Sequence, residues 1–321
     1  MKFDAPHFQS ETEARRYIEA LRWPNGVRVC GKCGSIGTDY PTKREGRYRC
    51  GQKECRKDFT VTTGTVMEAT HIKLNVWLMA FYLMASSKKG ISAHQLHRSL
   101  DVTYKTAWFL CHRIRLAMAN GGLAGPMGGA GQVVEADETY FGPVENPGKL
   151  RGDGRPYKRG GKQTGPANKR PIVALVERGG QARVFHVEDA NRATVTKLLR
   201  ENVDPASRLH TDESKLYTKV GEEFASHETV KHTAGEYARG DVHNNSAEGF
   251  FGVFKRGMRG VYQHCDEKHL HRYLSEFEFR HNTRTKLGWT DTQRAQRAIE
   301  GAEGKRLTYR RTSEQEAASL G

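Results

Sequence analysis

The strongest constraint on the fold is a group of four cysteines near the N-terminus. Two residues separate Cys30 from Cys33, four separate Cys50 from Cys55, and sixteen residues lie between the pairs. This spacing is typical of a four-thiolate site for one structural Zn²⁺, in which each pair of ligands sits on a tight turn. So short a segment cannot bury a large core, so the metal has to supply much of its stability. We therefore expect residues 1–70 to form a zinc ribbon that unfolds without its metal.

The overall charge points to a polyanionic partner. The 321 residues include 52 Lys and Arg against 37 Asp and Glu, a net charge of +15. Such an excess attracts phosphate through steering and counterion release, so double-stranded DNA or another nucleic acid is the first candidate partner. Basic and aromatic residues around the cysteines suit a ribbon that touches nucleic acid, although a ribbon that binds protein or packs on a neighbouring element has the same pattern. The residues in question are Tyr48, Arg49, Lys57 and Phe59.

No segment has the pattern of a secretion signal or a membrane span. The first twenty residues carry several acids and no apolar run. The most apolar stretch, 76–85, is too short to cross a bilayer and is predicted to be a core helix. We expect a cytoplasmic, nucleoid-associated protein with no membrane partner.

Residues 71–120 are predicted to form a helical module. Two helical stretches flank a break at 101–103, the outline of a helix-turn-helix in which Thr103 caps the second helix. In that helix Lys105 and Arg113 are candidate DNA-binding residues on faces away from the predicted core. The predicted core positions follow helical spacing and are Ala107, Leu110, Cys111 and Ile114. A purely structural helical hairpin is the alternative.

The rest of the chain is predicted to be an α/β domain. A Gly-rich segment, 121–132, is expected to be a linker, residues 133–309 the catalytic domain and 310–321 a polar tail. Short apolar runs predict three strands, a helix and a fourth strand, followed by a fifth strand and another helix. These elements are expected at 133–136, 171–177, 182–188, 193–202, 207–212, 228–233 and 246–258.

A basic segment separates the first two predicted strands. Residues 148–170 are dense in Gly, Lys and Arg and have no apolar periodicity, so we expect a loop. Lys158 and Arg159 in this loop are candidate contacts to the DNA backbone. A solvated insertion is the alternative interpretation.

Three acids have positions that suit catalysis. Asp137 and Asp212 each end a predicted strand, and Glu248 opens a predicted helix. Acids gathered at one sheet edge need cations, and a dense set of carboxylate oxygens suits two Mg²⁺ or Mn²⁺ ions that cut phosphodiester bonds. Each acid alone could be a turn or cap residue. Other acids lie within reach of the same elements, and the pattern does not choose among them: Glu135, Glu138, Glu213 and Asp241.

A basic residue follows the third acid at helical spacing. Lys255 lies seven residues after Glu248, two helical turns, so both side chains share a helix face. It could hold DNA beside the metal ions, although an ordinary surface lysine would fit the same pattern. Arg256 and Arg259 extend the basic surface.

Together these motifs resemble the ribonuclease-H-like DDE transposases of bacterial insertion sequences, in the branch with an N-terminal zinc ribbon. The resemblance covers most of the chain. The matching stretches are CGKC, RCGQKEC, KDFTVTTGTVME, ADETYFG, HTDES, HNNSAEGFFGVFKRGMRGVYQH and HRYLSEFEFRHNTR.

The resemblance implies a fold, a catalytic set and an activity. It implies a mixed sheet flanked by helices, with Asp137, Asp212 and Glu248 as the catalytic metal ligands and Lys255 as their basic companion. Some related enzymes use Asn as the third ligand, so Asn244 and Asn245 stay open as alternatives. The implied activity is binding of terminal inverted repeats, metal-dependent strand cleavage and strand transfer into target DNA, carried out by a homodimer or higher oligomer. A nuclease that does not join strands, a zinc-ribbon regulator and an inactive copy are the alternatives.

Overall fold

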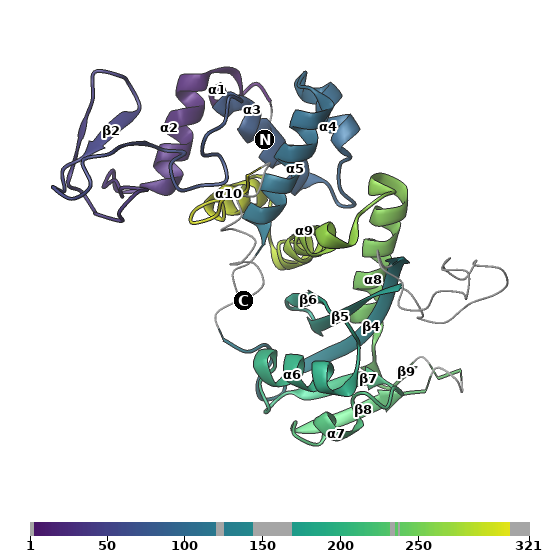
Figure 1. Ribbon diagram of the computed structural model, residues 1–321. Coiled ribbons are helices and arrows are strands. Elements are labelled where there is room, and N and C mark those ends of the chain that lie inside the picture. Colours follow the sequence, from purple (N-terminus) through teal and green to yellow (C-terminus); the bar gives the residue numbers. More distant parts are fainter. Residues whose placement is uncertain (1–2, 120–124, 144–168, 232–234, 237, 309–321) are drawn as a thin grey trace, which may run out of the picture. The chain divides into compact units, whose positions relative to one another are not determined.

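The computed structural model describes residues 3–119, 125–143, 169–231, 235–236 and 238–308, and the chain divides into two compact units. Unit 1 comprises Met1–Asn120 and Trp289–Gly321, and unit 2 comprises Gly121–Gly288 (Figure 1). Among the described residues no helix is both long and apolar enough to cross a membrane.

Unit 1 joins the cysteine-bearing ribbon to a helical module. Two short helices precede an antiparallel three-stranded sheet with the order β1-β2-β3, and further helices complete the unit. The elements are α1 (Pro6–Gln9), α2 (Glu11–Arg22), β1 (Asp39–Pro41), β2 (Arg47–Cys50), β3 (Asp58–Thr60), α3 (Leu74–Ser86), α4 (Ala93–Leu100), α5 (Tyr104–Met118) and α10 (Asp291–Glu300).

The helical module contains the predicted pair of helices, α4 and α5, on either side of the break at 101–103. Ser92 caps α4 by accepting a hydrogen bond from the Gln95 amide, and Thr103 caps α5 by accepting one from the Thr106 amide. Between them Asp101 adopts a left-handed conformation (φ 49°), which ends α4. The predicted core positions of α5 are buried, and the apolar stretch 76–85 lies in α3, whose Trp77 and Phe81 are fully buried.

Unit 2 is built on a five-stranded mixed sheet with the order β6-β5-β4-β7-β8. β4 pairs antiparallel with β5 and parallel with β7, so it is the central strand. The elements of this unit are β4 (Val133–Pro143), β5 (Lys169–Glu177), β6 (Ala182–His186), α6 (Arg192–Asn202), β7 (Arg208–Asp212), α7 (Thr218–Gly221), β8 (Ser226–Val230), β9 (Ala238–Arg239), β10 (Val242–His243), α8 (Asn245–Gly257) and α9 (Leu270–Asn282). This is the ribonuclease-H-like arrangement that the resemblance implies.

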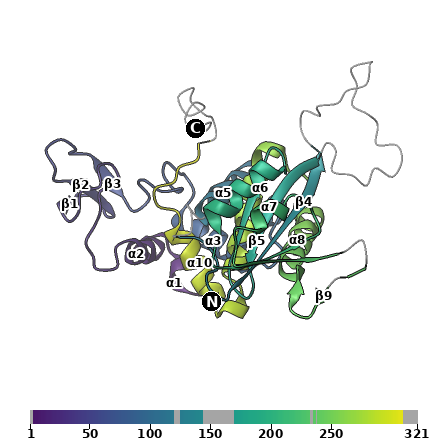
Figure 2. The same ribbon diagram turned by 90° about the horizontal axis from the view of Figure 1, so that it is seen from below.

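Helices cover both faces of this sheet (Figure 2). On one face, Val134, Ala136 and Leu209 pack with α6 and α7. On the other, Ala174 and its neighbours pack with α8 and α9, and the three phenylalanines of α8 are buried there as predicted. Because side chains alternate along a strand, Glu135 and Asp137 face the α8 side of the sheet.

Two expected boundaries differ from the structure. The catalytic domain was expected to extend to 309, but unit 2 ends at Gly288 because α10 buries Ala295, Ala298 and Ile299 within unit 1. The described part of the expected linker, residues 125–132, packs on unit 2: the Met127 amide donates to the Asn202 carbonyl (2.7 Å) and the side chain is buried. Residues 121–124 and the expected tail from 310 lie outside the described residues.

Candidate functional site

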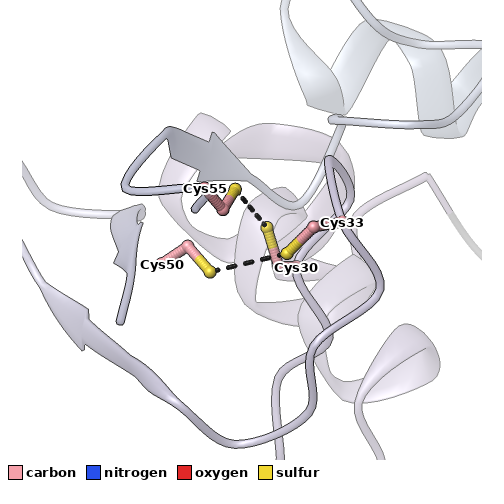
Figure 3. A group of neighbouring side chains, drawn as sticks. All are labelled: Cys30, Cys33, Cys50 and Cys55. Atoms are coloured by element: carbon pink, nitrogen blue, oxygen red, sulfur yellow. Dashed lines mark hydrogen bonds between the residues drawn. The ribbon is translucent and has the colours of Figure 1, made fainter. Parts of the chain in front are cut away.

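The four cysteines converge on one point of the ribbon (Figure 3). The Sγ atoms of Cys30 and Cys55 are 3.9 Å apart and those of Cys33 and Cys50 are 3.6 Å apart, and all four lie within 4.8 Å of one another. A tetrahedron with Zn–S bonds of about 2.3 Å has edges of about 3.8 Å. The four thiols therefore fit a structural zinc ion.

Turn geometry brings the first cysteine pair to this point. Gly34 has φ +78°, a conformation that favours glycine, and its amide donates to the Cys30 carbonyl. Hydrogen bonds with Ser35 lower the pKa of the Cys33 thiol to about 6, whereas burial raises that of Cys30 to about 11. Because zinc binds thiolates, the ion would hold all four groups deprotonated.

Asp137 and Asp212 lie side by side on parallel strands. Glu135 of β4 pairs with His210 of β7, and each aspartate stands two residues further along its own strand. Both aspartates therefore point to the α8 side of the sheet at neighbouring strand positions. β4 continues beyond Asp137 as far as Pro143, while β7 ends at Asp212.

The predicted acids Asp212 and Glu248 lie near enough to Asp137 to change its pKa. Burial, together with the negative charges of Asp212, Glu138 and Glu248, raises its pKa to about 8. The cluster is looser than the ribbon site, since in the described parts of the chain only the four cysteines form a group of three or more ligand side chains within 4.8 Å. A divalent cation stabilises carboxylates whose negative charges repel one another in this way. These oxygen ligands therefore suit Mg²⁺ or Mn²⁺.

Glu248 and the two asparagines lie at the start of α8. Glu248 is exposed in the first turn, and Asn245 just before it is also exposed. Asn244 is buried, and its Nδ2 donates a 3.4 Å hydrogen bond to the carbonyl of Ala136, next to Asp137. Its Oδ1 is buried with no hydrogen-bond partner among the described residues, so Asn244 brings a spare oxygen close to the acids.

Lys255 belongs to the same site. It is half-buried on α8, and burial lowers its pKa while the carboxylate of Asp137 raises it. Arg259 and Lys169 lower it further by repulsion. The structure thus brings together the four predicted residues Asp137, Asp212, Glu248 and Lys255.

A further acid and its partner were not identified from the sequence. Burial raises the pKa of Glu138, and the fully buried Tyr217 donates a 2.6 Å hydrogen bond from its hydroxyl to Glu138 Oε2. Asp212 also raises the pKa of Glu138 through its charge. The sequence pattern gave Glu138 only as one of four acids near these elements, and nothing in the local pattern indicated Tyr217.

Three of the predicted DNA-binding residues lie at the surface. Lys105 is exposed in the first turn of α5. Arg256 and Arg259 are exposed in α8 and in the π-helical segment Met258–Tyr262 that follows it. Lys158 and Arg159 lie outside the described residues.

The expectation for Arg113 is corrected by the structure. This side chain is 7% exposed, and its guanidinium donates to the carbonyls of Glu68 (2.7 Å) and Leu307 (3.2 Å). It also lies over the rings of Trp77 and Phe109. Helical spacing predicted an exposed Arg113 because it cannot show the segments of unit 1 that cover this side chain. The contacts of Arg113 are those of a residue that holds these segments together.

Family models match both parts of the chain. Residues 128–282 match the model described as an ISXO2-like transposase domain, and residues 9–58 match the transposase zinc-ribbon domain. A curated relative, an uncharacterized protein in transposable element ISH50 of Halobacterium salinarum, is 30% identical over 298 residues, which cover 88% of this chain and 94% of the relative.

Solved structures are similar only at low scores. The Mos1 transposase paired-end complex with left transposon end has a TM-score of 0.26 and 13% identity over 69% of this chain and 74% of that one. A chain of the simian T-cell lymphotropic virus intasome in complex with PP2A regulatory subunit B56 gamma has a TM-score of 0.28 and 13% identity over 57% of this chain and 67% of that one. Both scores are too low to establish a common fold.

Proposed function

This chain belongs to the zinc-ribbon-bearing DDE transposases of the ISXO2-like type, and from that membership we propose that it cuts the ends of an insertion sequence and joins them to target DNA. The observation that carries the proposal is the convergence of Asp137, Asp212 and Glu248 on one side of the sheet, with Lys255 in the field of Asp137. A DNA-binding regulator would have no use for this set of neighbouring, mutually repelling acids.

The acids are suited to hold two divalent metal ions. Asp137 and Asp212 would be ligands from the sheet and Glu248 a ligand from α8, with the spare oxygen of Asn244 as the alternative third ligand. When bound, Mg²⁺ or Mn²⁺ ions at such a site activate an attacking water or hydroxyl and stabilise the leaving oxygen of a phosphodiester.

The protein's own groups position the DNA. Lys255 is half-buried beside Asp137, where its ammonium group can hold a phosphate next to the reacting one. Arg256 and Arg259 continue this basic surface along the backbone of the strand. Lys105, at the exposed start of α5, and the ribbon would grip the terminal inverted repeats.

Two successive displacements would complete the reaction at one site. A water molecule first hydrolyses the phosphodiester at the element's end, and the freed 3′-hydroxyl then attacks a target phosphodiester. The leaving oxygen departs in line in each step, so no covalent bond between protein and DNA forms and no Tyr or Ser nucleophile is needed. Because two ends have to be inserted together, the active form is a homodimer or a higher oligomer on DNA.

The test is an end-processing assay with the purified, zinc-loaded protein. A labelled duplex that carries the element's own end is incubated with Mg²⁺ and target DNA, and nicked and joined products are scored. Asp212→Asn should abolish both products, whereas Asp189→Asn, a change at an exposed aspartate outside the site, should leave them unchanged. Nicking without joining would indicate a nuclease, and end binding without cleavage would indicate a regulator.

A further inference from the structure

Glu135 is a fully buried carboxylate directly behind the proposed catalytic acids. It is 0% exposed, and it stands two residues before Asp137 on the same face of β4. A buried carboxylate is costly unless hydrogen bonds and a positive charge satisfy it. The groups that donate hydrogen bonds to Glu135 therefore indicate its role.

The first partners of Glu135 belong to the start of α8. Its Oε2 accepts hydrogen bonds from the backbone amides of Ser246 (2.6 Å) and Ala247 (3.2 Å), and its Oε1 accepts one from Ser246 Oγ (2.9 Å). Amides in the first helical turn have no partner within the helix and are usually satisfied by the side chain of the N-cap residue. Asn244, the N-cap residue of α8, makes no such bond. Glu135 thus caps α8 from a neighbouring strand.

Arg178, which follows β5, is a second partner of Glu135, and His243 Nδ1 lies 3.5 Å from the same Oε1. Arg178 Nε donates a 2.9 Å hydrogen bond to Glu135 Oε1 and neutralises the buried charge. The same guanidinium donates to the carbonyls of Asp241 (2.7 Å) and His243 (3.1 Å), on the segment that leads into α8. Arg178 and Glu135 therefore hold both the approach to α8 and its first turn against the sheet.

This arrangement leaves Glu135 no capacity to bind a metal. A carboxylate offers about four lone-pair positions. Here Oε1 accepts from Ser246 Oγ and Arg178, and Oε2 accepts from two amides, so all four are in use. Asp137 differs because its neighbours are other acids and Lys255. The contacts thus separate two acids that the sequence pattern left equivalent.

We propose that Glu135 is a positioning residue that fixes the first turn of α8 to β4 and so sets Glu248 and Asn244 at the correct distance from Asp137 for metal binding. The inference rests on the proposed function and deepens it. Glu248 lies two residues after Ser246, and Asp137 lies two residues after Glu135. The hydrogen bonds of Glu135 and the proposed metal ligands therefore belong to the same two elements, β4 and α8. Loss of these hydrogen bonds would leave each ligand side chain intact but would let the distance between Asp137 and Glu248 vary.

The test measures Mn²⁺ affinity as well as cleavage. Full-length, zinc-loaded protein is titrated with Mn²⁺, and free Mn²⁺ is followed by its electron paramagnetic resonance signal. Glu135→Gln keeps the size of the side chain but loses its charge and part of its acceptor capacity. We expect Mn²⁺ affinity and end cleavage to fall together by about 10- to 100-fold, as is usual when the group behind a metal ligand is changed.

Controls separate positioning from loss of fold. Glu135→Gln should retain its zinc, its circular dichroism spectrum and its affinity for the DNA end. Cleavage by this variant should recover in part at high Mn²⁺, because its ligands remain, whereas Asp137→Asn should not recover. Ser246→Ala removes only the Oγ hydrogen bond and should give a smaller loss, roughly below tenfold, so it serves if Glu135→Gln does not fold.

The outcomes distinguish this inference from the proposed function. Equal Mn²⁺ affinity and cleavage in wild type, folded Glu135→Gln and Ser246→Ala, together with loss in Asp137→Asn, would overturn the positioning role alone. If Asp137→Asn also matched wild type in both measurements, the proposed catalytic site would fail and the positioning role with it.

Discussion

The substitution Tyr217→Phe, which removes one hydroxyl, should destabilise unit 2 because that hydroxyl makes a buried hydrogen bond. The Tyr217 hydroxyl is fully buried and donates a 2.6 Å hydrogen bond to Glu138, whose carboxyl is itself largely buried. A hydrogen bond to a charged group contributes about 1.5–3 kcal/mol, and its loss leaves an acceptor unsatisfied. We therefore expect the free energy of opening of unit 2 to fall by about 1.5–3 kcal/mol.

Hydrogen exchange measured by mass spectrometry reports this change for each unit separately. Since about 1.4 kcal/mol corresponds to a factor of ten, β4 amides should exchange roughly ten- to a hundredfold faster in Tyr217→Phe. Peptides from α3, in unit 1, should be unchanged. Tyr140→Phe is the matched control, because within the described residues the Tyr140 hydroxyl makes no hydrogen bond. Unchanged β4 exchange in Tyr217→Phe, or an equal change in Tyr140→Phe, would refute the reasoning.

Three further predictions concern zinc, protons and the basic residues. Removal of zinc with a chelator, or Cys50→Ser, should unfold β1–β3, measured as loss of exchange protection in the ribbon; persistent protection would contradict a metal-built module. Because the pKa of the Asp137 carboxyl is about 8 in the folded protein and far lower in an unfolded chain, the metal-free protein should lose stability as pH rises from about 4 to 8. For the same reason Mg²⁺ binding at pH 7 should release close to one proton. Calorimetry in buffers of different ionisation enthalpy measures the proton release, which Asp137→Asn should abolish. Arg113→Ala should lower stability by about 1–3 kcal/mol without weakening end binding by the folded protein. Lys105→Ala should instead weaken end binding by the folded protein.

The order of elements in unit 2 could be predicted because each strand is a compact apolar run. The runs at 133–136, 171–177 and 207–212 correspond to β4, β5 and β7, and the acids at two of their ends lie on neighbouring parallel strands. The cysteine spacing likewise predicted a cluster that the structure forms, because metal-binding turns require little beyond local sequence.

What the sequence could not predict depends on contacts between distant segments. The hydrogen bonds between Glu135 and Ser246 join residues more than a hundred positions apart in the sequence, and strand alternation alone left Glu135 and Asp137 equivalent because they share one face of β4. Arg113 was expected at the surface because helical spacing cannot show that carbonyls of Glu68 and Leu307 lie beside it. The assignment of α10 to unit 1 has the same origin, since only its partners reveal which core its alanines fill.

The most direct test of the central claim is anomalous diffraction from crystals of the protein grown with Mn²⁺ and a DNA end. The account predicts Mn²⁺ peaks within about 2.5 Å of carboxylate oxygens of Asp137 and Asp212, with a third ligand from Glu248 or Asn244, besides a zinc peak among the four cysteines. A zinc peak in the ribbon with no Mn²⁺ at Asp137 or Asp212, in a complex that holds the DNA end, would contradict it.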